Sequence, residues 1–487
     1  MKKYLTIGLL ALAWLLFPAG SCSGSGDPDS PVVNPGGGSG SGSGGSSGSG
    51  SGSQPVPTAT LGQPLPAWAE GMLDIHFINT TTGECTFLIF PDGTQMLIDA
   101  AGSLEKTGLV RANATVTNTG IRARWDPTRE SGWRVGPFLA DYIQSCMAWT
   151  GNPTLDYAVL THFHNDHFGR RDGVNGNEPV STLSPTYVLQ SFPEMLDTFP
   201  VGLLLDRGYP SYDYPFDMAT KAGNAANCKN YITAVKWHVA NKGLQAEKFK
   251  AGSRSQIVLK KKAADYPTFT VQNIAVNGEI WNGGTTTTAT PTFPPLSEIS
   301  VANPASVGNA DKCPEENHCS IVMKISYGKF DYFAGADAQY DGMSTFEWKD
   351  METPVAKAAG EVDVMKADHH GVTNTNGHGF VSSKTGKTAE AMKYLKPKCW
   401  IVNSWNDEHP RQTVFEGVAA YSPGMDIFIT NTCPEMTSYA RWSQVKGSNG
   451  HIVVRVAPGG DTYWVYVLSD SDRKKNVTKI NGPYTSK

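Results

Sequence analysis

A short run of metal-ligand residues directly after an apolar segment constrains this chain more than any other feature. The apolar segment is Tyr157-Ala158-Val159-Leu160, and His162 to His167 then follow in the order His-x-His-x-Asp-His. A strand held in a core fixes the loop at its end, so several side chains of that loop can be aimed at one point. Imidazole and carboxylate groups bind Zn²⁺ and similar divalent ions. The motif therefore predicts a metal site, and its predicted ligands are His162, His164, Asp166 and His167.

Three later segments supply further candidate groups. Asp337 follows the strand-like Tyr332-Phe333-Ala334, and Gly335 lets the backbone turn close to the site, so Asp337 is the best candidate for a carboxylate bridging two ions. His369 and His370 follow another predicted strand, and we expect one to bind metal while the other donates a proton or holds an oxyanion. His409, before Pro410, is a candidate for contacting substrate or acting as an acid.

The amino terminus predicts export. Lys2 and Lys3 precede an apolar run from Leu5 to Phe17, which is too short to span a bilayer and is typical of a signal peptide. The small residues before Cys22 resemble the lipobox of bacterial lipoproteins. This resemblance implies cleavage after residue 21, lipidation of Cys22 and an extracytoplasmic, membrane-anchored protein in the cell envelope.

The remaining chain divides by composition. Residues 22–63 form a predicted flexible linker, since Gly36 to Ser53 is almost only glycine and serine. Residues 64–487 form one predicted folded domain. Within it, we interpret the stretch from about 170 to 304 as an insertion around the same site. It contains one clear helix, 225–242, whose His238 we expect to be a core or surface residue.

The rest of the domain alternates strands and helices, which predicts the α/β class. A helix is predicted from 136 to 149, because its apolar residues recur on one face. Predicted strands lie at 73–78, 86–90, 96–99, 157–160, 320–327, 331–333, 362–365, 399–402, 450–456 and 463–468.

Charge and cysteine content narrow the function only slightly. The net charge is -4, which gives no general attraction to nucleic acid, and Lys260-Lys261-Lys262 is the only dense basic run. Of eight cysteines, seven remain when Cys22 is set aside, so at least one should be free unless it pairs between chains. Cys313 and Cys319 are close enough in sequence to close a small disulfide loop.

In their order along the chain, these motifs resemble the metallo-β-lactamase superfamily, and most closely its ComEC-type branch of competence proteins and related phosphodiesterases. His162 to His167 matches the ligand motif of the superfamily at every position. The resemblance also rests on the strands at 73–78 and 96–99, on Asn317 and Ser320 before the Tyr327-Gly328 turn, on His369-His370-Gly371 and on His409-Pro410.

The resemblance implies a four-layer αββα sandwich with the site along one edge. It implies that His162 and His164 bind a first metal, that Asp166, His167 and one histidine of the 369–370 pair bind a second, and that Asp337 bridges them. The third histidine of the first metal has no counterpart here; His238, His318 or water are the candidates. Glu84 stands where the branch often has aspartate.

A site for two divalent ions indicates a hydrolase. Zn²⁺ is the first choice for these ligands, and Mn²⁺ or Fe²⁺ are alternatives. The ions would activate water, oriented by Asp166 or Asp337, to attack a phosphodiester or related ester, small or polymeric, with His370 or His409 assisting the leaving group. Two alternatives remain open: a nuclease of the ComEC type, and a non-catalytic surface lipoprotein that binds a glycan or a partner.

Overall fold

The computed structural model describes residues 56–102, 134–172, 178–299, 312–340, 344–372, 386, 388–406, 408–471 and 473–487. The described residues belong to one compact unit, Gly52–Lys487. The predicted signal peptide, the lipidation site at Cys22 and most of the predicted linker lie outside the described residues. In the part that is described, no helix combines the length and the apolarity that a membrane span requires.

The first half of the unit and the carboxyl-terminal strands build one nine-stranded mixed sheet. Its strands β3 to β6 run parallel and its other pairs are antiparallel. In spatial order the strands are β18 (Val477–Thr485), β17 (Thr462–Leu468), β16 (His451–Val456), β1 (Leu73–Phe77), β2 (Thr86–Ile89), β3 (Gln95–Ile98), β4 (Leu155–Val159), β5 (Val201–Asp206) and β6 (Gln245–Lys248).

A second nine-stranded mixed sheet comes from the later part of the chain. Strands β11 to β15 are parallel, whereas β10, β7, β8 and β9 continue the sheet in antiparallel pairs. In spatial order they are β15 (Val445–Ser448), β14 (Asp426–Ile429), β13 (Cys399–Val402), β12 (Val364–Lys366), β11 (Phe330–Ala334), β10 (Val322–Tyr327), β7 (Phe269–Val276), β8 (Glu279–Trp281) and β9 (Ala289–Pro291).

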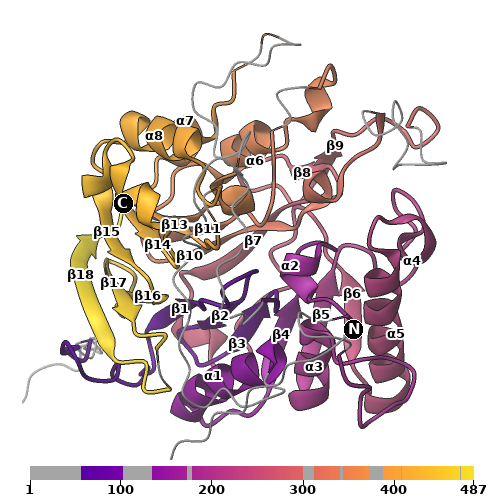
Figure 1. Cartoon of the computed structure of the whole chain (residues 1–487), viewed down its shortest axis with the longest axis horizontal. Helices are drawn as coiled ribbons and strands as arrows, with labels where there is room; N and C mark the ends of the chain where they lie inside the picture. The colour runs from indigo at the N-terminus through magenta and orange to yellow at the C-terminus, as the bar shows by residue number, and fades with distance from the viewer. Residues whose placement is uncertain are drawn as a thin grey trace, which may run out of the picture. The chain divides into compact units, whose positions relative to one another are not determined.

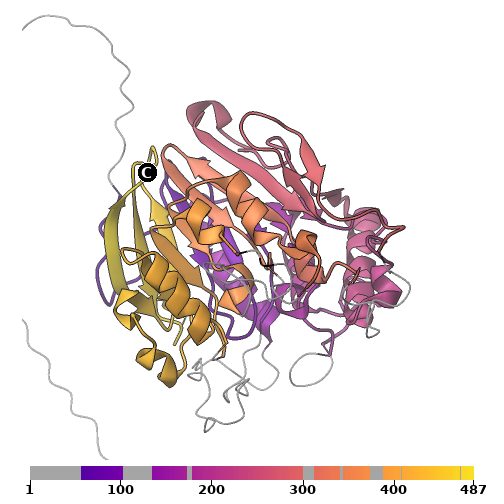
Figure 2. The ribbon, with the colours of Figure 1, turned by 90° about the horizontal axis from the view of Figure 1, so that it is seen from above.

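The two sheets share one apolar core, and helices cover their other faces (Figure 1). Strand β1 illustrates the alternation: Ile75 packs into the core between the sheets, while His76 contacts Tyr142 of helix α1 (Val135–Thr150). Helices α1, α3 (Ser191–Thr198) and α5 (Ala225–Lys242) pack on the first sheet. Figure 2 looks onto α6 (Glu352–Ala359), α7 (Ala391–Leu395) and α8 (Gln412–Tyr421), which pack on the second. The predicted α/β class is confirmed, and the two sheets are compatible with a sandwich.

The stretch from 170 to 304 contributes to both sheets. It supplies β5 and β6 to the first sheet and β7 to β9 to the second. The predicted helix at 225–242 is α5, which ends at Gly243 in the left-handed region, where the Gly243 N–H donates to the carbonyl of His238. The seven cysteines that the structure describes are all buried and none of them forms a disulfide, so the small loop between Cys313 and Cys319 is not closed by one.

Candidate metal centre

The candidate site lies where parallel strands of both sheets end. Strand β4 leads into His162 and then into the short helix α2 (Asn165–Phe168), which carries Asp166 and His167. In the second sheet, β11 leads to Asp337, and β12 leads to the turn η5 (Asp368–Gly371). A backbone hydrogen bond from Ile321 N to Thr161 O joins the two sheets at this edge. Ligand candidates that are far apart in the sequence therefore converge.

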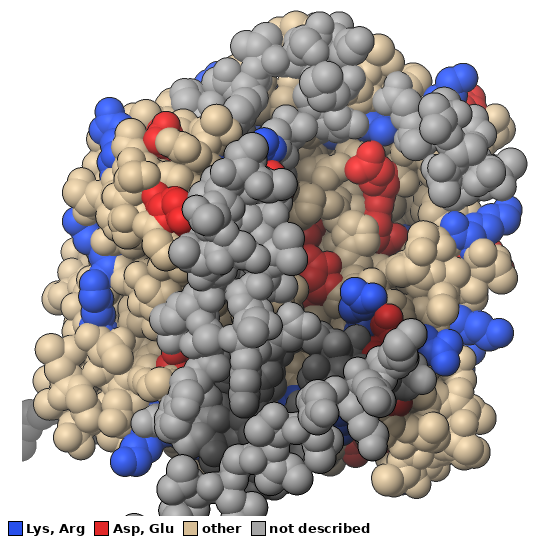
Figure 3. Space-filling view, in the orientation of Figure 1, with Lys and Arg blue, Asp and Glu red and all other residues tan. Residues whose placement is uncertain are grey.

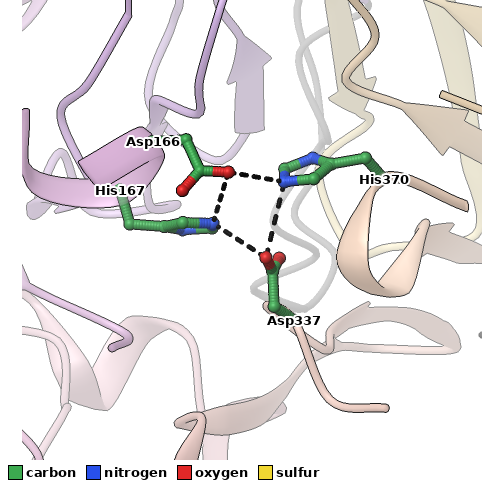
Figure 4. Close-up of side chains that lie close together, drawn as sticks. All are labelled: Asp166, His167, Asp337 and His370. Carbon is green, nitrogen blue, oxygen red and sulfur yellow. Dashed lines mark hydrogen bonds and ion pairs between the residues drawn. The ribbon is translucent and has the colours of Figure 1, made fainter. Parts of the chain in front are cut away.

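One group of four side chains could hold a metal ion: Asp166, His167, Asp337 and His370 (Figure 4). The Oδ2 atom of Asp337 lies 3.1 Å from Nε2 of His167 and 3.4 Å from Nε2 of His370. The Oδ2 atom of Asp166 lies 3.4 Å from Nε2 of His370 and 4.0 Å from Nε2 of His167. All four potential ligand atoms therefore face one point.

A second group shares Asp337 with the first. It consists of His162, His164 and Asp337, whose ligand atoms also lie within 4.8 Å of one another. Nε2 of His162 is 3.7 Å from Oδ2 of Asp337, and the rings of His162 and His167 lie 4.0 Å apart between centroids. The two groups are thus neighbours with a carboxylate in common.

The distances suit a metal ion better than a closed network of hydrogen bonds. Ligand bonds of about 2.0–2.1 Å in a tetrahedral site put the ligand atoms roughly 3.3–3.5 Å apart. The measured separations of 3.1 to 4.0 Å bracket that range. In addition, Nε2 of His162 and Nε2 of His370 are buried without a hydrogen-bond partner. Because buried polar atoms are normally partnered, a cation is the group that these nitrogens fit.

Carboxylates behind the histidines fix the direction of their rings. Oδ2 of Asp99 lies 2.8 Å from Nδ1 of His167, so that Nε2 of the same ring faces the cluster. Thr161 donates its hydroxyl to Asp99 and lies 3.1 Å from Nδ1 of His162. Oε1 of Glu84 lies 3.0 Å from Nδ1 of His370, where the two form an ion pair when His370 is protonated, without the geometry of a hydrogen bond. Such partners orient metal-binding imidazoles and raise their basicity.

The electrostatics of the metal-free protein show what charge the site favours. Burial lowers the pKa of His370, but the carboxylates of Asp337 and Glu84 outweigh it and raise the pKa to about 10. Burial likewise opposes protonation of His167, yet Asp337 and Asp99 hold its pKa well above the usual range. The pKa of Asp337 is well below its usual range, because His167, His370 and Lys366 overcome its burial. The cluster therefore attracts positive charge.

Lys366 is a buried cation beside the cluster. Its Nζ lies 2.6 Å from Oε1 of Glu84 and 3.4 Å from Oδ1 of Asp337, and it donates to the carbonyl of Ala336 at 2.6 Å. Although burial lowers the pKa of Lys366, Glu84 and Asp337 raise it above the ordinary value. Lys366 thus faces Oδ1 of Asp337 while the histidines face Oδ2.

The backbone makes close approaches at this point. A Cβ on Gly83, which has a φ of +123°, would lie 2.8 Å from the carbonyl oxygen of Asp166, so a side chain there would displace the ligand loop. A Cβ on Gly335 would collide with the carboxylate of Asp368. His369 and His370 have φ values of 44° and 56°, in the left-handed region that non-glycine residues seldom adopt. Strain of this kind accumulates at functional sites.

The two histidines of the 369–370 pair point to different places. His370 is buried and joins the four-residue group. The side chain of His369 is 25% exposed; its Nε2 lies 3.9 Å from Asp337 Oδ2 and 3.2 Å from Nδ2 of Asn317. Burial lowers the pKa of His369 to about 4. His370 is therefore the better-placed ligand, and His369 lies at the border of the site.

His409 and Trp405 pack against the outer side of His370. The Trp405 ring centroid is 4.2 Å from that of His370 and 4.1 Å from that of His409. His409 is buried, and its Nδ1 has no hydrogen-bond partner. Burial and the charge of His370 hold the pKa of His409 well below its usual range. Trp405 contacts the ring of His370 but leaves its Nε2 facing the cluster.

The two histidines considered as a third ligand of the first metal lie in neither of these groups. His238 is 2.8 Å from Asp197 and 3.1 Å from the Tyr187 hydroxyl, so it is the core histidine that the sequence suggested. His318 belongs to the turn η3 (Glu316–Cys319), where its Nδ1 is 3.1 Å from the backbone nitrogen of Glu315.

Sequence reasoning missed the orienting groups Asp99, Glu84 and Lys366. Asp99 carried one usable signal, because it ends the predicted strand at 96–99 and β3 pairs in parallel with the motif strand β4. The only signal at Glu84 was that the ComEC-type branch often has aspartate at this position. Lys366 had no signal, since a lysine at the end of a short strand is usually solvent-exposed.

No protein-family model matches the sequence, and no curated protein matches it. Among solved structures, the chain is similar to a crystal structure from Parabacteroides distasonis described as a "Putative metal-dependent hydrolase". The sequence identity is 10% and the TM-score 0.28, with 73% of this chain and 92% of that chain covered. A likeness this weak establishes neither a shared fold nor a shared activity, so the chemistry of the centre follows from its own geometry.

Proposed function

We propose that this protein is a metal-dependent hydrolase that uses two metal ions to cleave a phosphodiester or a related ester outside the cytoplasm. The observation that carries the proposal is the sharing of Asp337 by two adjacent buried groups of histidine and aspartate. A carboxylate can serve one ion with each oxygen or both ions with one, which suits it to a bridge. Zn²⁺ is the first candidate for such ligands, with Mn²⁺ and Fe²⁺ next.

When bound, such ions lower the pKa of a coordinated water to about 7 and stabilise charge on the attacking and leaving oxygens. The residues of the chain then have distinct tasks in this proposal. Asp337 would hold both ions, because it belongs to both ligand groups. Asp166, whose side chain is 28% exposed, is the accessible carboxylate of the cluster and orients the attacking water by accepting its hydrogen bond.

Assistance to the leaving group falls to His369 in this proposal. His370 faces inward as a ligand, whereas His369 is partly exposed and lies beside Asn317. Both side chains can contact an oxygen of the substrate. His409 is also a candidate for this role, but it is buried and packed against Trp405, whereas His369 is partly exposed.

The substrate we favour is a small diester rather than nucleic acid. The backbone nitrogens of Lys260 and Lys261 donate to the side chains of Thr94 and Asp92, which precede β3. Asp99 and the metal cluster follow β3. The basic run is therefore at the opposite end of that strand. In the part of Figure 3 that is not grey, red acidic side chains lie near the middle of the face, and most blue basic side chains lie towards its margin. A protein that binds the phosphate backbone of DNA needs basic side chains, not acidic ones, gathered around its site.

Two further features are proposed from the sequence motifs. The order of motifs and the helices on both outer faces support the αββα layering of the metallo-β-lactamase superfamily, and the same motifs resemble its ComEC-type branch. The apolar run before Cys22 supports export and a lipid anchor. Globomycin-sensitive processing and labelling with a fatty-acid probe, lost in Cys22→Ala, would test the anchor.

The central experiment combines metal analysis with turnover of a bis-aryl phosphodiester. The parent is expected to hold metal and to be active. His164→Ala and His370→Ala should bind less metal, because each lacks a proposed ligand. His369→Ala should keep its metal but show a lower kcat. Parallel assays on DNA, a lactam, a lactone and a thioester separate the substrate classes. A parent protein without metal and without turnover, indistinguishable from His164→Ala, would refute the hydrolase and leave the non-catalytic surface lipoprotein.

A further inference from the structure

The peptide groups of Phe163 are held by side chains from remote parts of the chain. Phe163 lies between the two candidate ligands His162 and His164. Its N–H donates to Oε1 of Glu316 at 2.7 Å, and its carbonyl accepts from Nδ2 of Asn224 at 2.7 Å. The backbone between the two ligands is therefore fixed from both sides by contacts that local sequence does not provide.

Glu316 is itself anchored by a buried cation. Arg207, which follows β5 and is fully buried, donates from Nε to Oε1 of Glu316 at 2.6 Å and from a terminal nitrogen to Oε2. The guanidinium also donates to the carbonyl of Tyr214 at 2.9 Å, and it lies 4.8 Å from the centroid of the Phe163 ring. A two-point pair of this kind fixes direction as well as distance.

We propose that Arg207 and Glu316 form a clamp on Phe163 that sets the separation and direction of His162 and His164. The clamp thereby sets the affinity for the first ion, the one that His162, His164 and Asp337 would bind. This inference rests on the proposed metal-dependent function. Both residues are positioning residues, because neither lies in the groups that could hold an ion.

The effect should be selective for one ion. His162 and His164 are covalently joined through Phe163, so a rotation of its peptide planes moves both imidazoles. Metal–ligand distances in proteins lie within about 0.2 Å of their standard values, so a shift of both imidazoles should weaken binding. The second ion would be bound by the other group, which takes Asp166 and His167 from helix α2 and His370 from the second sheet. The histidines of that group contact Asp99 and Glu84 instead. Loss of the clamp should therefore weaken the first ion and spare the second.

The test uses two double variants that differ at one position. Arg207→Met with Glu316→Gln, the amide variant, removes both charges but keeps an oxygen that can accept from the Phe163 N–H. Arg207→Met with Glu316→Leu, the apolar variant, removes the acceptor as well. Both charges are replaced together because a single substitution would leave a buried ion unpaired. The matched control is Asp74→Asn with Arg455→Met, which breaks another fully buried two-point pair, between β1 and β16 of the same sheet.

The measurement is a titration of the metal-free full-length proteins with Zn²⁺ against a chromophoric chelator. His164→Ala and His370→Ala mark the loss of the first and the second ion. We expect the apolar variant to lose about 10- to 100-fold in first-ion affinity with the second ion unchanged. The amide variant should lose less, and the control with both Asp74 and Arg455 replaced should bind both ions like the parent even if its melting temperature falls.

Three outcomes would contradict the inference. Equal weakening of both ions would make Arg207 and Glu316 merely structural, and unchanged affinities in both variants would remove any role in metal binding. If the apolar variant does not fold, an unchanged first-ion affinity in the amide variant has the same meaning. A parent that binds no Zn²⁺ at all would instead refute the proposed function, which keeps the two failures distinct.

Discussion

Oδ2 of Asp337 lies 3.1 Å from Nε2 of His167, although 170 positions of sequence separate the two residues. His167 belongs to the first sheet's ligand loop and Asp337 to the end of β11 in the second sheet. Each residue alone is an ordinary polar side chain at a strand end. Their approach defines the candidate centre.

Asp337→Asn should remove more metal than the loss of any single histidine. Asp337 belongs to both ligand groups, while His164 belongs to one. The amide keeps the shape but not the charge that draws the ions. We expect His164→Ala to retain one ion per chain and Asp337→Asn to retain less, by elemental analysis after dialysis. Asp461→Asn, at an exposed ion pair with Lys329, is the control and should keep the metal content of the parent.

Metal binding should release protons. In the metal-free protein burial opposes protonation of His370 and His167, but the neighbouring carboxylates outweigh it. They raise the pKa of His370 to about 10 and hold the pKa of His167 well above its usual range, which favours the protonated form of both imidazoles. An ion must displace these protons, and its apparent affinity should therefore rise with pH from 6 towards 9. Calorimetry in buffers of different ionisation enthalpy should show a net release of protons at full loading. No release in the parent, or the same release in His370→Ala, would show that these groups are not ligands.

The buried pair of Asp74 and Arg455 should stabilise the fold down to low pH. Arg455 donates to both carboxylate oxygens, at 2.8 and 2.7 Å. Burial opposes the charge of Asp74, but Arg455 outweighs it and lowers the pKa of Asp74 from 3.8 to about 2. Because the folded-state pKa is the lower one, the stabilisation is present above about pH 4 and is lost as the pH falls through 2.

The size of that contribution can be measured with Asp74→Asn. The pKa shift corresponds to about 2 kcal/mol, and the stranded Arg455 adds to the loss. The free energy of unfolding by urea should thus fall by at least about 2 kcal/mol at pH 7. The difference between variant and parent should narrow at pH 3 and below. A difference that does not change with pH would contradict the assignment.

Asp99→Asn should weaken metal binding without removing a ligand. Asp99 accepts from Nδ1 of His167 and from Thr161. An amide can instead donate to Nδ1, which would place the ring proton on Nε2, the atom that faces the cluster. We expect about a 10- to 100-fold loss of affinity, measured by competition with a chelator. Asp156→Asn, beside Asn152 at the other end of β4, is the control. Equal affinity in Asp99→Asn and the parent would exclude an orienting role.

Periodicity in the sequence was enough to locate many elements. The apolar residues of α1 recur at helical spacing, and the alternation in β1 sends Ile75 to one face and His76 to the other. Several strands were missed, among them the largely buried β7 and β14 and the more exposed β18 and β6. The edge strand β18 contains Lys479, Gly482 and Pro483, and β6 reads Gln-Ala-Glu-Lys, so neither shows the apolar pattern of a strand with a buried face.

The ligand motif at the end of β4, the α/β class and the candidate residues Asp337, His369 and His370 could all be predicted from the sequence. The folded protein was needed to show that His370 faces Asp337 while His369 stays at the border, that Glu84 and Asp99 contact the histidines, and that Arg207 and Glu316 hold Phe163. The reason is that a ligand motif is a local property of consecutive residues at one strand end. The orienting contacts join strand ends of two sheets, and their geometry exists only once the common core has packed.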